Sequence, residues 1–326
     1  MDRKSLSVLA LPTSCTPFRP GFSFVTSATA QPATGRLDAR VPARSGPWIS
    51  AWRRLRRSPP AVVGLLLIGT LVVVAAFAER LAPHGPYEII TTREDIPPLA
   101  PGPGRALGTD DLGRDVLSRI IHGSRISLQL GLISVAIGGG LGVTTGLVSG
   151  YYSGWVDRTI MRGIDVMLAF PGILLALVIV AILGPDLNNA MIAVGLAAMP
   201  HYTRVVRGSV LGVRELQYIE AARVIGCRDG AMMFRHILPN VLAPVIVLAT
   251  LGVASAIIAG AALSFLGLGA KPPTPEWGAM LSEGRAYLRT APWITTFPGA
   301  AIMVTVLAIN LLGDGLRDAL DPRMRR

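Results

Sequence analysis

The stretch Ile126–Val156, which reads ISLQLGLISVAIGGGLGVTTGLVSGYYSGWV, contains no Asp, Glu, Lys or Arg and decides the fold class of this chain. A helix of about 20 apolar residues crosses the roughly 30 Å of hydrocarbon in a bilayer. Five further stretches are also uncharged: Ala61–Ala78, Val166–Pro185, Leu187–Thr203, Ile237–Ala270 and Thr290–Gly313. Soluble core helices rarely stay uncharged over such lengths, and 51% of the 326 residues are hydrophobic. We therefore exclude a soluble protein.

The uncharged stretches predict an all-α, polytopic membrane protein with six transmembrane helices in a lipid bilayer. Residues 47–326 form the expected transmembrane domain, and residues 1–46, rich in Pro, Ser, Thr and Arg, predict a disordered cytoplasmic tail. A signal peptide is the competing interpretation of the tail, but its apolar segment Leu6–Leu11 is too short. The six spans are expected at about residues 60–80, 126–150, 166–185, 187–207, 241–263 and 297–313.

The net charge of +11 is distributed unevenly about these spans. With six crossings and the N-terminus inside, 22 of the 31 Lys and Arg residues lie inside, against 10 of the 20 acidic residues. This asymmetry follows the positive-inside rule and predicts that both termini are cytoplasmic. The basic balance therefore reports topology and argues against nucleic acid as a partner.

The segment between the first two predicted spans, residues 83–125, is polar and rich in proline, and we expect an external loop there. Its later part, Gly113–Gly123, places charged and apolar residues at helical spacing. This pattern predicts a short amphipathic helix on the outer face of the membrane. A solvated loop helix is the alternative.

The second predicted span carries a glycine at every fourth position, namely Gly138, Gly142, Gly146 and Gly150. Residues at this spacing lie on one face of a helix, where glycine lets another helix approach closely and gain van der Waals contact in lipid. We expect a helix-packing surface here.

Several kinds of catalytic and binding site are missing from the sequence. The only lysines, Lys4 and Lys271, do not follow glycine, so the phosphate-binding Gly-Lys-Ser/Thr signature cannot occur. The histidines and cysteines show no metal-ligand spacing. The spans contain almost no ionisable residue, which argues against an ion-coupled carrier, and no convincing catalytic set is present. If transport is driven by ATP, the ATPase is therefore another polypeptide.

A cytoplasmic loop is expected at residues 209–240, and its later part is a charged island, Glu220–Asn240, which reads EAARVIGCRDGAMMFRHILPN. Good helix formers fill Glu215–Ile225, and Gly226 gives the backbone the freedom for a sharp turn. A second short helix is expected over Arg228–Ile237, closed by Pro239. A cytoplasmic helix–turn–helix of this kind suits insertion into a groove of a partner; an ordinary cytoplasmic loop is the alternative.

The island resembles the EAA loop of permease subunits in ABC importers. The matching residues are Glu220, Ala221, Ala222, Gly226, Ile237, Leu238 and Pro239. His236 stands where the general consensus has isoleucine, but His-Ile-Leu-Pro-Asn is similar to the dipeptide/oligopeptide/nickel branch. The stretches LGTDDLGRD at 107–115 and ALSFLGLG at 262–269 resemble the second, "C-type" permease of that branch. The resemblance covers about Trp52–Pro322.

The resemblance implies a type I ABC importer-like permease in a bacterial-type plasma membrane. The expected partners are a homologous permease subunit, two cytoplasmic ATPase subunits and an extracytoplasmic substrate-binding protein. The chain is then not an enzyme and holds no cofactor or metal, because ATP and Mg bind to the ATPase subunits. The small alanines of the loop would allow close approach to the ATPase, and Gly226 would permit the turn.

Three functional alternatives stay open at this point. Di- or oligopeptides are the expected substrates, with nickel or another small solute as the alternative in the same family. A non-energised channel or scaffold is a hypothesis of a different class, and an intramembrane enzyme is a third. In the external loop, we expect Asp110, Asp111, Arg114 and Asp115 to help dock the binding protein or gate the pathway; packing against the membrane domain is the alternative.

Overall fold

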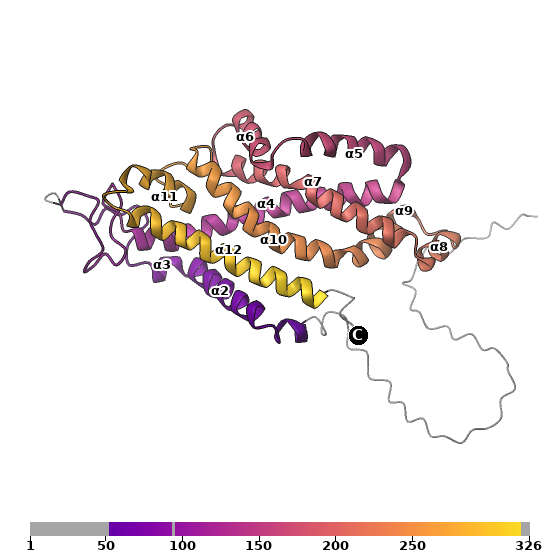
Figure 1. The fold of residues 1–326 in the computed structure, drawn as a ribbon, viewed down its shortest axis with the longest axis horizontal. Helices are drawn as coiled ribbons and strands as arrows, with labels where there is room; N and C mark the ends of the chain where they lie inside the picture. The colour runs from indigo at the N-terminus through magenta and orange to yellow at the C-terminus, as the bar shows by residue number, and fades with distance from the viewer. Residues whose placement is uncertain (1–51, 93–94, 321–326) are drawn as a thin grey trace, which may run out of the picture.

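The computed structural model describes residues 52–92 and 95–320, so the predicted tail 1–46 lies outside the described residues. Within the described part the chain is helical, and its only β-structure is three isolated bridges. The long helices run side by side in an elongated bundle (Figure 1). The elements are α2 (Pro59–Ala76), α3 (Ala78–Leu81), α4 (Val116–Tyr152), α5 (Gly154–Leu168), α6 (Gly172–Leu183), α7 (Leu187–Arg214), α8 (Gln217–Val224), α9 (Asp229–Ala231), the π-helical turn η1 (Met232–Ile237), α10 (Leu238–Phe265), α11 (Trp277–Gly284), the 3₁₀ turn η2 (Arg285–Tyr287) and α12 (Trp293–Leu320).

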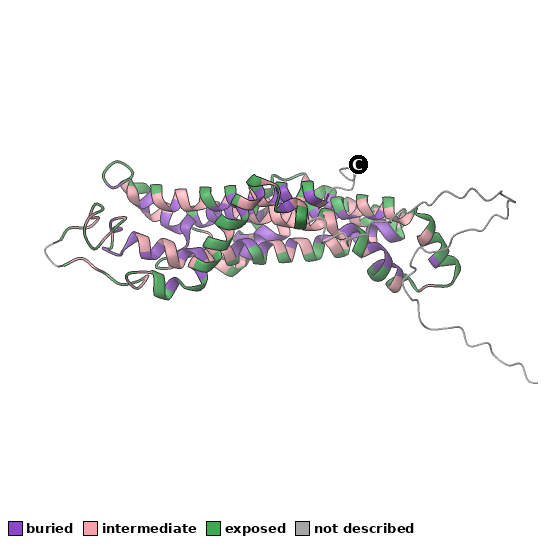
Figure 2. Cartoon of the chain, turned by 90° about the horizontal axis from the view of Figure 1, so that it is seen from below, coloured by how far each residue is buried: buried purple, intermediate pink, exposed green. Residues whose placement is uncertain are grey.

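The bundle has two different ends, which we name the α11 end and the α8 end after the short helices found there (Figure 1). The long connection between α3 and α4 lies at the α11 end, and α8 with α9 lies at the other. Figure 2 shows buried residues between the helices along the length of the bundle and exposed residues on its outer faces.

The helical membrane fold is confirmed, but the predicted number of six spans is not. Among the described residues, four segments are long and apolar enough to cross a membrane: α2, α4, the continuous segment Asp229–Phe265, and α12. The pair α5–α6, bent by 93°, would make a fifth. The predicted span at 166–185 is broken before Gly172, and α6 has only 12 residues, about 18 Å at 1.5 Å per residue.

Helix α7 is long enough to span, but its polar residues, such as Asn188, Asn189 and His201, make it less apolar than the other long helices. It is packed against α4, α6 and α10. A helix that is surrounded by protein on several sides needs fewer apolar side chains than one that faces lipid. The prediction of six spans thus rested only on the lengths of the uncharged stretches. The placement of both termini in the cytoplasm stays a prediction.

The prediction of an amphipathic surface helix at Gly113–Gly123 was wrong. Helix α4 begins at Val116, where the Asp115 carboxylate caps it by accepting a hydrogen bond of 2.9 Å from the Ser118 backbone amide. Residues 116–125 are therefore the first turns of α4, and the external connection ends before them. Val116 and Arg119 are buried, so this segment is part of the bundle instead of lying on its surface.

The glycines at every fourth position of α4 face α7. A Cβ atom at Gly138 would lie 2.5 Å from the Gly195 carbonyl oxygen, and one at Gly142 would lie 2.4 Å from Tyr202 Cβ. Further along, Gly146 and Gly150 face Thr203, Val206 and Val210 at 2.7–2.8 Å. Any side chain would push the helices apart, so glycine is what allows the α4–α7 contact.

Helix α5 is fastened to α7 by two ion pairs. Arg207 Nε lies 2.5 Å from Asp157 Oδ1, and Arg204 Nη2 lies 2.6 Å from Asp165 Oδ1. Both pairs lie in the half of α7 nearer to the α8 end.

Candidate functional site: the α8 hairpin

The turn after α8 depends on glycine. Gly226 has a φ of +81°, a conformation that costs an L-residue with a side chain roughly 1–2 kcal/mol. Its amide donates to the Arg223 carbonyl at 3.0 Å, and the Cys227 amide donates to the Ala222 carbonyl at 3.1 Å. These two bonds form a Schellman motif, which ends a helix and reverses the chain. The predicted helix–turn–helix is thus present, with its turn at the expected glycine.

Helix α8 is anchored to the bundle by its inner face. Ile219 and Ala222 are buried and belong to one hydrophobic cluster with residues of α4, α7, η1 and α10. The other buried members are Leu147, Tyr151, Val206, Val210, Met232, Met233, Ile237 and Val241. We call the segment from α8 to the end of η1, Gln217–Ile237, the α8 hairpin. Since several kcal/mol of apolar burial connect these elements, we treat the α8 hairpin and the adjoining ends of α4 and α7 as one rigid unit.

Hydrogen bonds fix the hairpin further. The Tyr151 hydroxyl at the end of α4 donates to Asp229 Oδ1 at 2.6 Å. Asn240 Nδ2 donates to the Tyr218 hydroxyl at 3.0 Å and to the His236 carbonyl at 2.7 Å. Burial raises the pKa of the Tyr218 phenol, which therefore stays neutral near pH 7 and accepts the bond from Asn240. These bonds join α4, α8 and α10 at the α8 end.

The second half of the hairpin differs from the prediction. Pro239 was expected to close a short helix, but α9, η1 and α10 form one continuous helical segment, and Pro239 lies in the first turn of α10. Proline lacks a backbone amide and its ring clashes with the carbonyl of the preceding turn, so a helical segment that continues through it departs from α-helical geometry there. The π-helical turn Met232–Ile237 accommodates the transition. Movement of the hairpin is therefore connected directly to the long helix α10.

The residues of the loop motif occupy both faces of the hairpin. Glu220, Ala221 and Gly226 are exposed, whereas Ala222 and Ile237 are buried. Leu238 is half-buried and Pro239 is exposed. The motif thus combines an outer surface with the side chains that anchor it.

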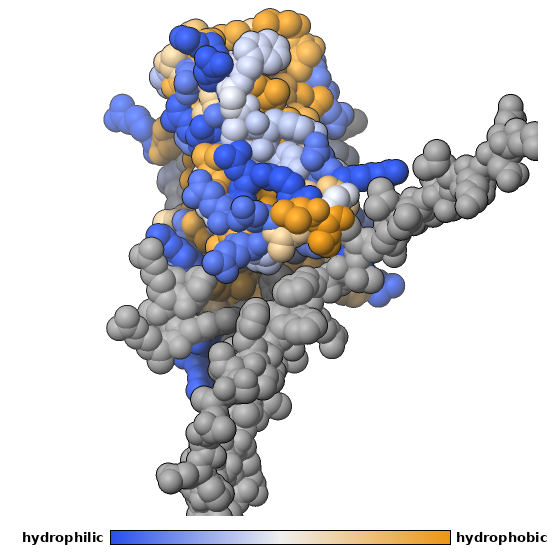
Figure 3. All heavy atoms as spheres, turned by 90° about the vertical axis from the view of Figure 1, so that its right-hand side faces the viewer, coloured by the Kyte–Doolittle hydropathy of each residue, from blue (hydrophilic) through white to orange (hydrophobic). Residues whose placement is uncertain are grey.

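Sequence reasoning missed an apolar surface on this hairpin. Val224, Ile225 and Phe234 are 82%, 77% and 62% exposed, and Leu216 is exposed beside them. Figure 3, which views the α8 end, shows apolar patches among polar side chains. The signal was present as apolar residues inside the charged island. Exposed apolar side chains rimmed by polar ones mark an interaction surface.

A second cluster lies at the α11 end. Asp110 Oδ2 lies 2.6 Å from Arg114 Nε and 2.5 Å from Arg119 Nη1. Glu283 Oε2 accepts from the same two guanidinium groups at 3.1 and 2.8 Å. Burial raises the pKa of the neighbouring Asp111 carboxyl. The network ties α11 to the start of α4.

The residues predicted to dock the binding protein or gate the pathway lie in or beside this network, and most of them are buried. Asp110, Arg114 and Asp115 are buried, and only Asp111 is partly exposed. The carboxylates of Asp110, Asp111 and Glu283 approach one another closely enough to hold a metal ion. Two arginines already neutralise Asp110 and Glu283, so the cluster has the chemistry of an internal ion-pair network. The role of these residues in docking or gating stays a prediction.

Comparison with known proteins shows the family of this chain. Residues 142–326 match the family "Binding-protein-dependent transport system inner membrane component", and residues 46–101 match "N-terminal TM domain of oligopeptide transport permease C". A dipeptide transport system permease protein of Alkalihalophilus pseudofirmus is 48% identical over 86% of this chain and 91% of its own length. A glutathione transport system permease protein of Pectobacterium atrosepticum is 48% identical over 86% and 92%.

A solved structure has the same fold. A chain of the MetNI methionine ABC transporter, in a study of its inward-facing conformations, aligns with a TM-score of 0.51. It is 19% identical, and the alignment covers 63% of this chain and 97% of that one. On the sequence match over most of its length, this chain belongs to the binding-protein-dependent transport system inner membrane components, the non-catalytic permease subunits of ABC transporters.

Proposed function

We propose that this chain forms half of the membrane pathway of an ATP-driven importer of short peptides. A related permease would supply the other half, two ATPase subunits would bind the α8 hairpins, and an external binding protein would deliver the substrate. The observation that carries the proposal is the exposed apolar surface of the α8 hairpin on a rigid support. The relatives named for dipeptide and glutathione transport support a short peptide as the substrate class.

The position of the α8 hairpin would let it transmit movement of the ATPase to the helices in the membrane. Eleven residues of α7, 204–214, follow the last position of its uncharged stretch, which corresponds to about 16 Å of helix at 1.5 Å per residue. The α8 hairpin thus lies well outside the uncharged part of the bundle, where a water-soluble partner reaches it. A short helix with exposed apolar residues suits a groove on that partner.

Coupling follows from the packing of the hairpin. Because α8 shares a buried cluster with α4, α7 and α10, displacement of the hairpin moves three long helices together. ATP-driven closure of the ATPase pair would draw the two hairpins toward each other and change the access of the pathway. Such coupling requires the ATPases to bind one conformation of the permease more tightly than the other.

The test exchanges Gly226 for valine in the complete transporter. A Cβ at Gly226 meets no atom within 4 Å, so Gly226→Val acts through its positive φ and changes the turn without a clash. Gly230→Val is the matched control, because Gly230 also has open space and its φ is not in the left-handed region. ATP-dependent peptide uptake and ATP hydrolysis are measured on vesicles that contain both permeases, the ATPases and the binding protein.

We expect Gly226→Val to hydrolyse ATP with little peptide uptake, and Gly230→Val to transport like the parent. Equal transport by both variants would refute the role of the turn in coupling. Absence of ATP-dependent uptake of any short peptide by the parent would refute the proposed function itself.

A further inference from the structure

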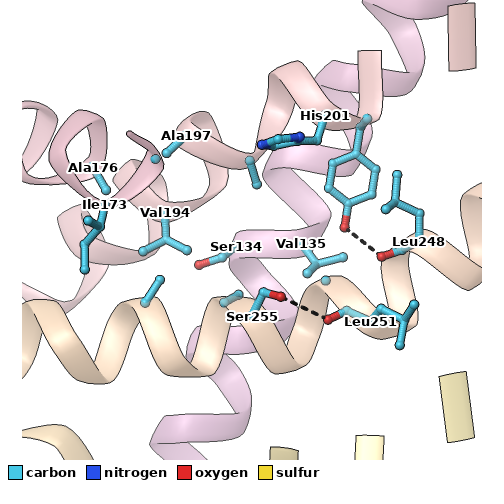
Figure 4. Close-up of a pocket in the computed structure, with 16 residues that line it drawn as sticks. Ser134, Val135, Ile173, Ala176, Val194, Ala197, His201, Leu248, Leu251 and Ser255 are labelled. Carbon is cyan, nitrogen blue, oxygen red and sulfur yellow. Dashed lines mark hydrogen bonds between the residues drawn. The ribbon is translucent and has the colours of Figure 1, made fainter. Parts of the chain in front are cut away.

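A cavity of about 320 Å³ opens between α4, α6, α7 and α10. Figure 4 shows the side chains that converge on it. Most of the lining is small, including Ala176, Ala197, Gly252 and Ser255. His201 is an exposed, ionisable residue at its border. Sequence analysis assigned this histidine no site, because the histidines show no metal-ligand spacing.

A second cavity, of about 620 Å³, adjoins the first. The two share Leu248 and Leu251 in their linings, so they lie end to end along α10. The second continues past Pro244 to Asn240 and to Arg317 of α12. We call the combined hollow, which follows α10 from Ala259 to Asn240, the α10 groove. Its course of 20 residues corresponds to roughly 28 Å of helix, close to the thickness of the hydrocarbon layer.

Contacts with α2, an uncharged helix long enough to cross a membrane, show the depth of the groove. Gly315 of α12 lies against Ala61 near the start of α2, and Gly313, two residues away, lies against Leu251. At the other end of α2, Arg125 Nη2 donates to the Ala76 carbonyl. The part of the groove beyond Leu251 toward the α11 end thus lies level with α2, whereas the part around Asn240 lies toward the α8 end. The α10 groove leads from bilayer depth to the α8 end.

The chemistry of the groove distinguishes possible occupants. The Tyr202 hydroxyl donates to the Leu248 carbonyl at 3.4 Å, and Ser255 donates to the Leu251 carbonyl at 3.5 Å, so these hydroxyls are satisfied by the protein. His201 and Arg317 have no hydrogen-bond or ion-pair partner within residues 52–92 and 95–320. A lipid chain would pair with neither. A short peptide offers them a carboxylate and backbone carbonyls, and the small lining leaves space for varied side chains.

We infer that the α10 groove is this chain's share of the translocation pathway and that it holds a short peptide in extended form at bilayer depth. The inference rests on the proposed function and assigns its pathway residues. Ser255 stands at the centre of the assignment, because it is exposed and lines the groove without belonging to the buried core.

The test places one bulky side chain in the groove and another beside it. Ser255→Trp fills the groove, and Ile258→Trp is the matched control, since Ile258 is an exposed residue of α10 that lines neither cavity. Uptake of a labelled dipeptide is measured with the complete transporter in vesicles, after assembly has been checked by size-exclusion chromatography. We expect Ser255→Trp to lower uptake by at least about tenfold, the effect of about 1.4 kcal/mol of added barrier, and Ile258→Trp to transport like the parent.

A second measurement keeps the inference testable if Ser255→Trp fails to assemble. Ser255→Cys and Ile258→Cys are exposed to a small charged thiol reagent in the vesicles, with the unsubstituted chain, which has its own Cys15 and Cys227, as the baseline. We expect Ser255→Cys to react and bound peptide to slow the reaction, whereas Ile258→Cys stays at the baseline.

Three results overturn the inference. The first is unchanged uptake by Ser255→Trp, and the second is an equal loss of uptake in both tryptophan variants. The third is labelling of Ser255→Cys that stays at the baseline like that of Ile258→Cys, which would show a lipid or a partner helix in the groove. In each of these the parent still transports peptide, so the proposed function survives. A parent that imports no peptide with ATP overturns both.

Discussion

Replacing Gly142 of α4 by alanine should destabilise the bundle, although alanine is the better helix former. The new Cβ would lie 2.4 Å from Tyr202 Cβ, 2.9 Å from the Met199 carbonyl oxygen and 3.1 Å from the Thr203 amide nitrogen. Ordinary contacts begin near 3.4 Å, so α4 and α7 would have to separate by about 1 Å. None of these atoms can rotate away, because they belong to the backbone of α7 or are attached directly to it.

The magnitude follows from two opposing effects. Alanine gains about 1 kcal/mol over glycine in helix propensity. Overpacking of a close-packed contact costs about 1–3 kcal/mol, and the rigid neighbours of Gly142 place it near the upper value. We therefore expect a net loss of about 2 kcal/mol in the free energy of unfolding, with a fall of several degrees in the apparent unfolding midpoint.

Gly140→Ala is the matched control, two residues away on the same helix. A Cβ at Gly140 meets no atom within 4 Å, so only the propensity gain applies. The unfolding midpoint of the purified transporter in detergent is measured for both variants by differential scanning fluorimetry. If Gly142→Ala is as stable as Gly140→Ala, the α4–α7 contact does not depend on the glycine surface, and the reasoning fails.

Three further predictions concern charge, pH and the partner surface. Arg119→Met should lower the free energy of unfolding by about 3–5 kcal/mol, because it leaves Asp110 and Glu283 buried with one guanidinium fewer; a thermal midpoint equal to that of the parent would contradict this. Burial raises the pKa of Glu276 above its ordinary value of 4.5, so the folded state binds the proton more tightly than the unfolded state. The stability of the parent relative to Glu276→Gln should therefore fall as the pH rises from about 4.5, and unfolding midpoints that differ by a constant across pH would count against it. Phe234→Asp should reduce co-purification of the ATPase subunits while Phe234→Leu retains it, since only the first places a charge on the apolar surface; equal recovery in a pull-down would remove Phe234 from the interface.

The elements that sequence patterns predicted well are those specified by local chemistry. Five of the six uncharged stretches became long helices, whereas the stretch at 166–185 is divided between α5 and the short α6. Helix α4 starts ten residues before the predicted span because Asp115 caps it. The turn at Gly226 was predictable because a helix end that requires positive φ strongly favours glycine. Pro239 was misread as the end of a helix, since the helical segment continues through it by way of the π-helical turn Met232–Ile237.

Other features depend on segments that are distant in the sequence. Arg114 and Arg119 meet Glu283, which follows them by 169 and 164 residues, and this contact turns an apparently external charged motif into a buried network. The prediction of six spans was not confirmed, for a related reason. Hydropathy measures how well a segment suits contact with lipid, but much of the surface of α7 packs against protein.

By itself, the sequence determined the membrane class, the helical fold, the family and the position of the turn at Gly226. Each of these follows from the order of charges, apolar residues and glycines within a segment of a few helical turns. Only the tertiary structure decided that the α4 glycines face α7, that the α11-end charges are buried, and that His201 and Arg317 border one groove along α10. These are matters of which helix packs on which, and packing is set by contacts between segments that no local pattern records.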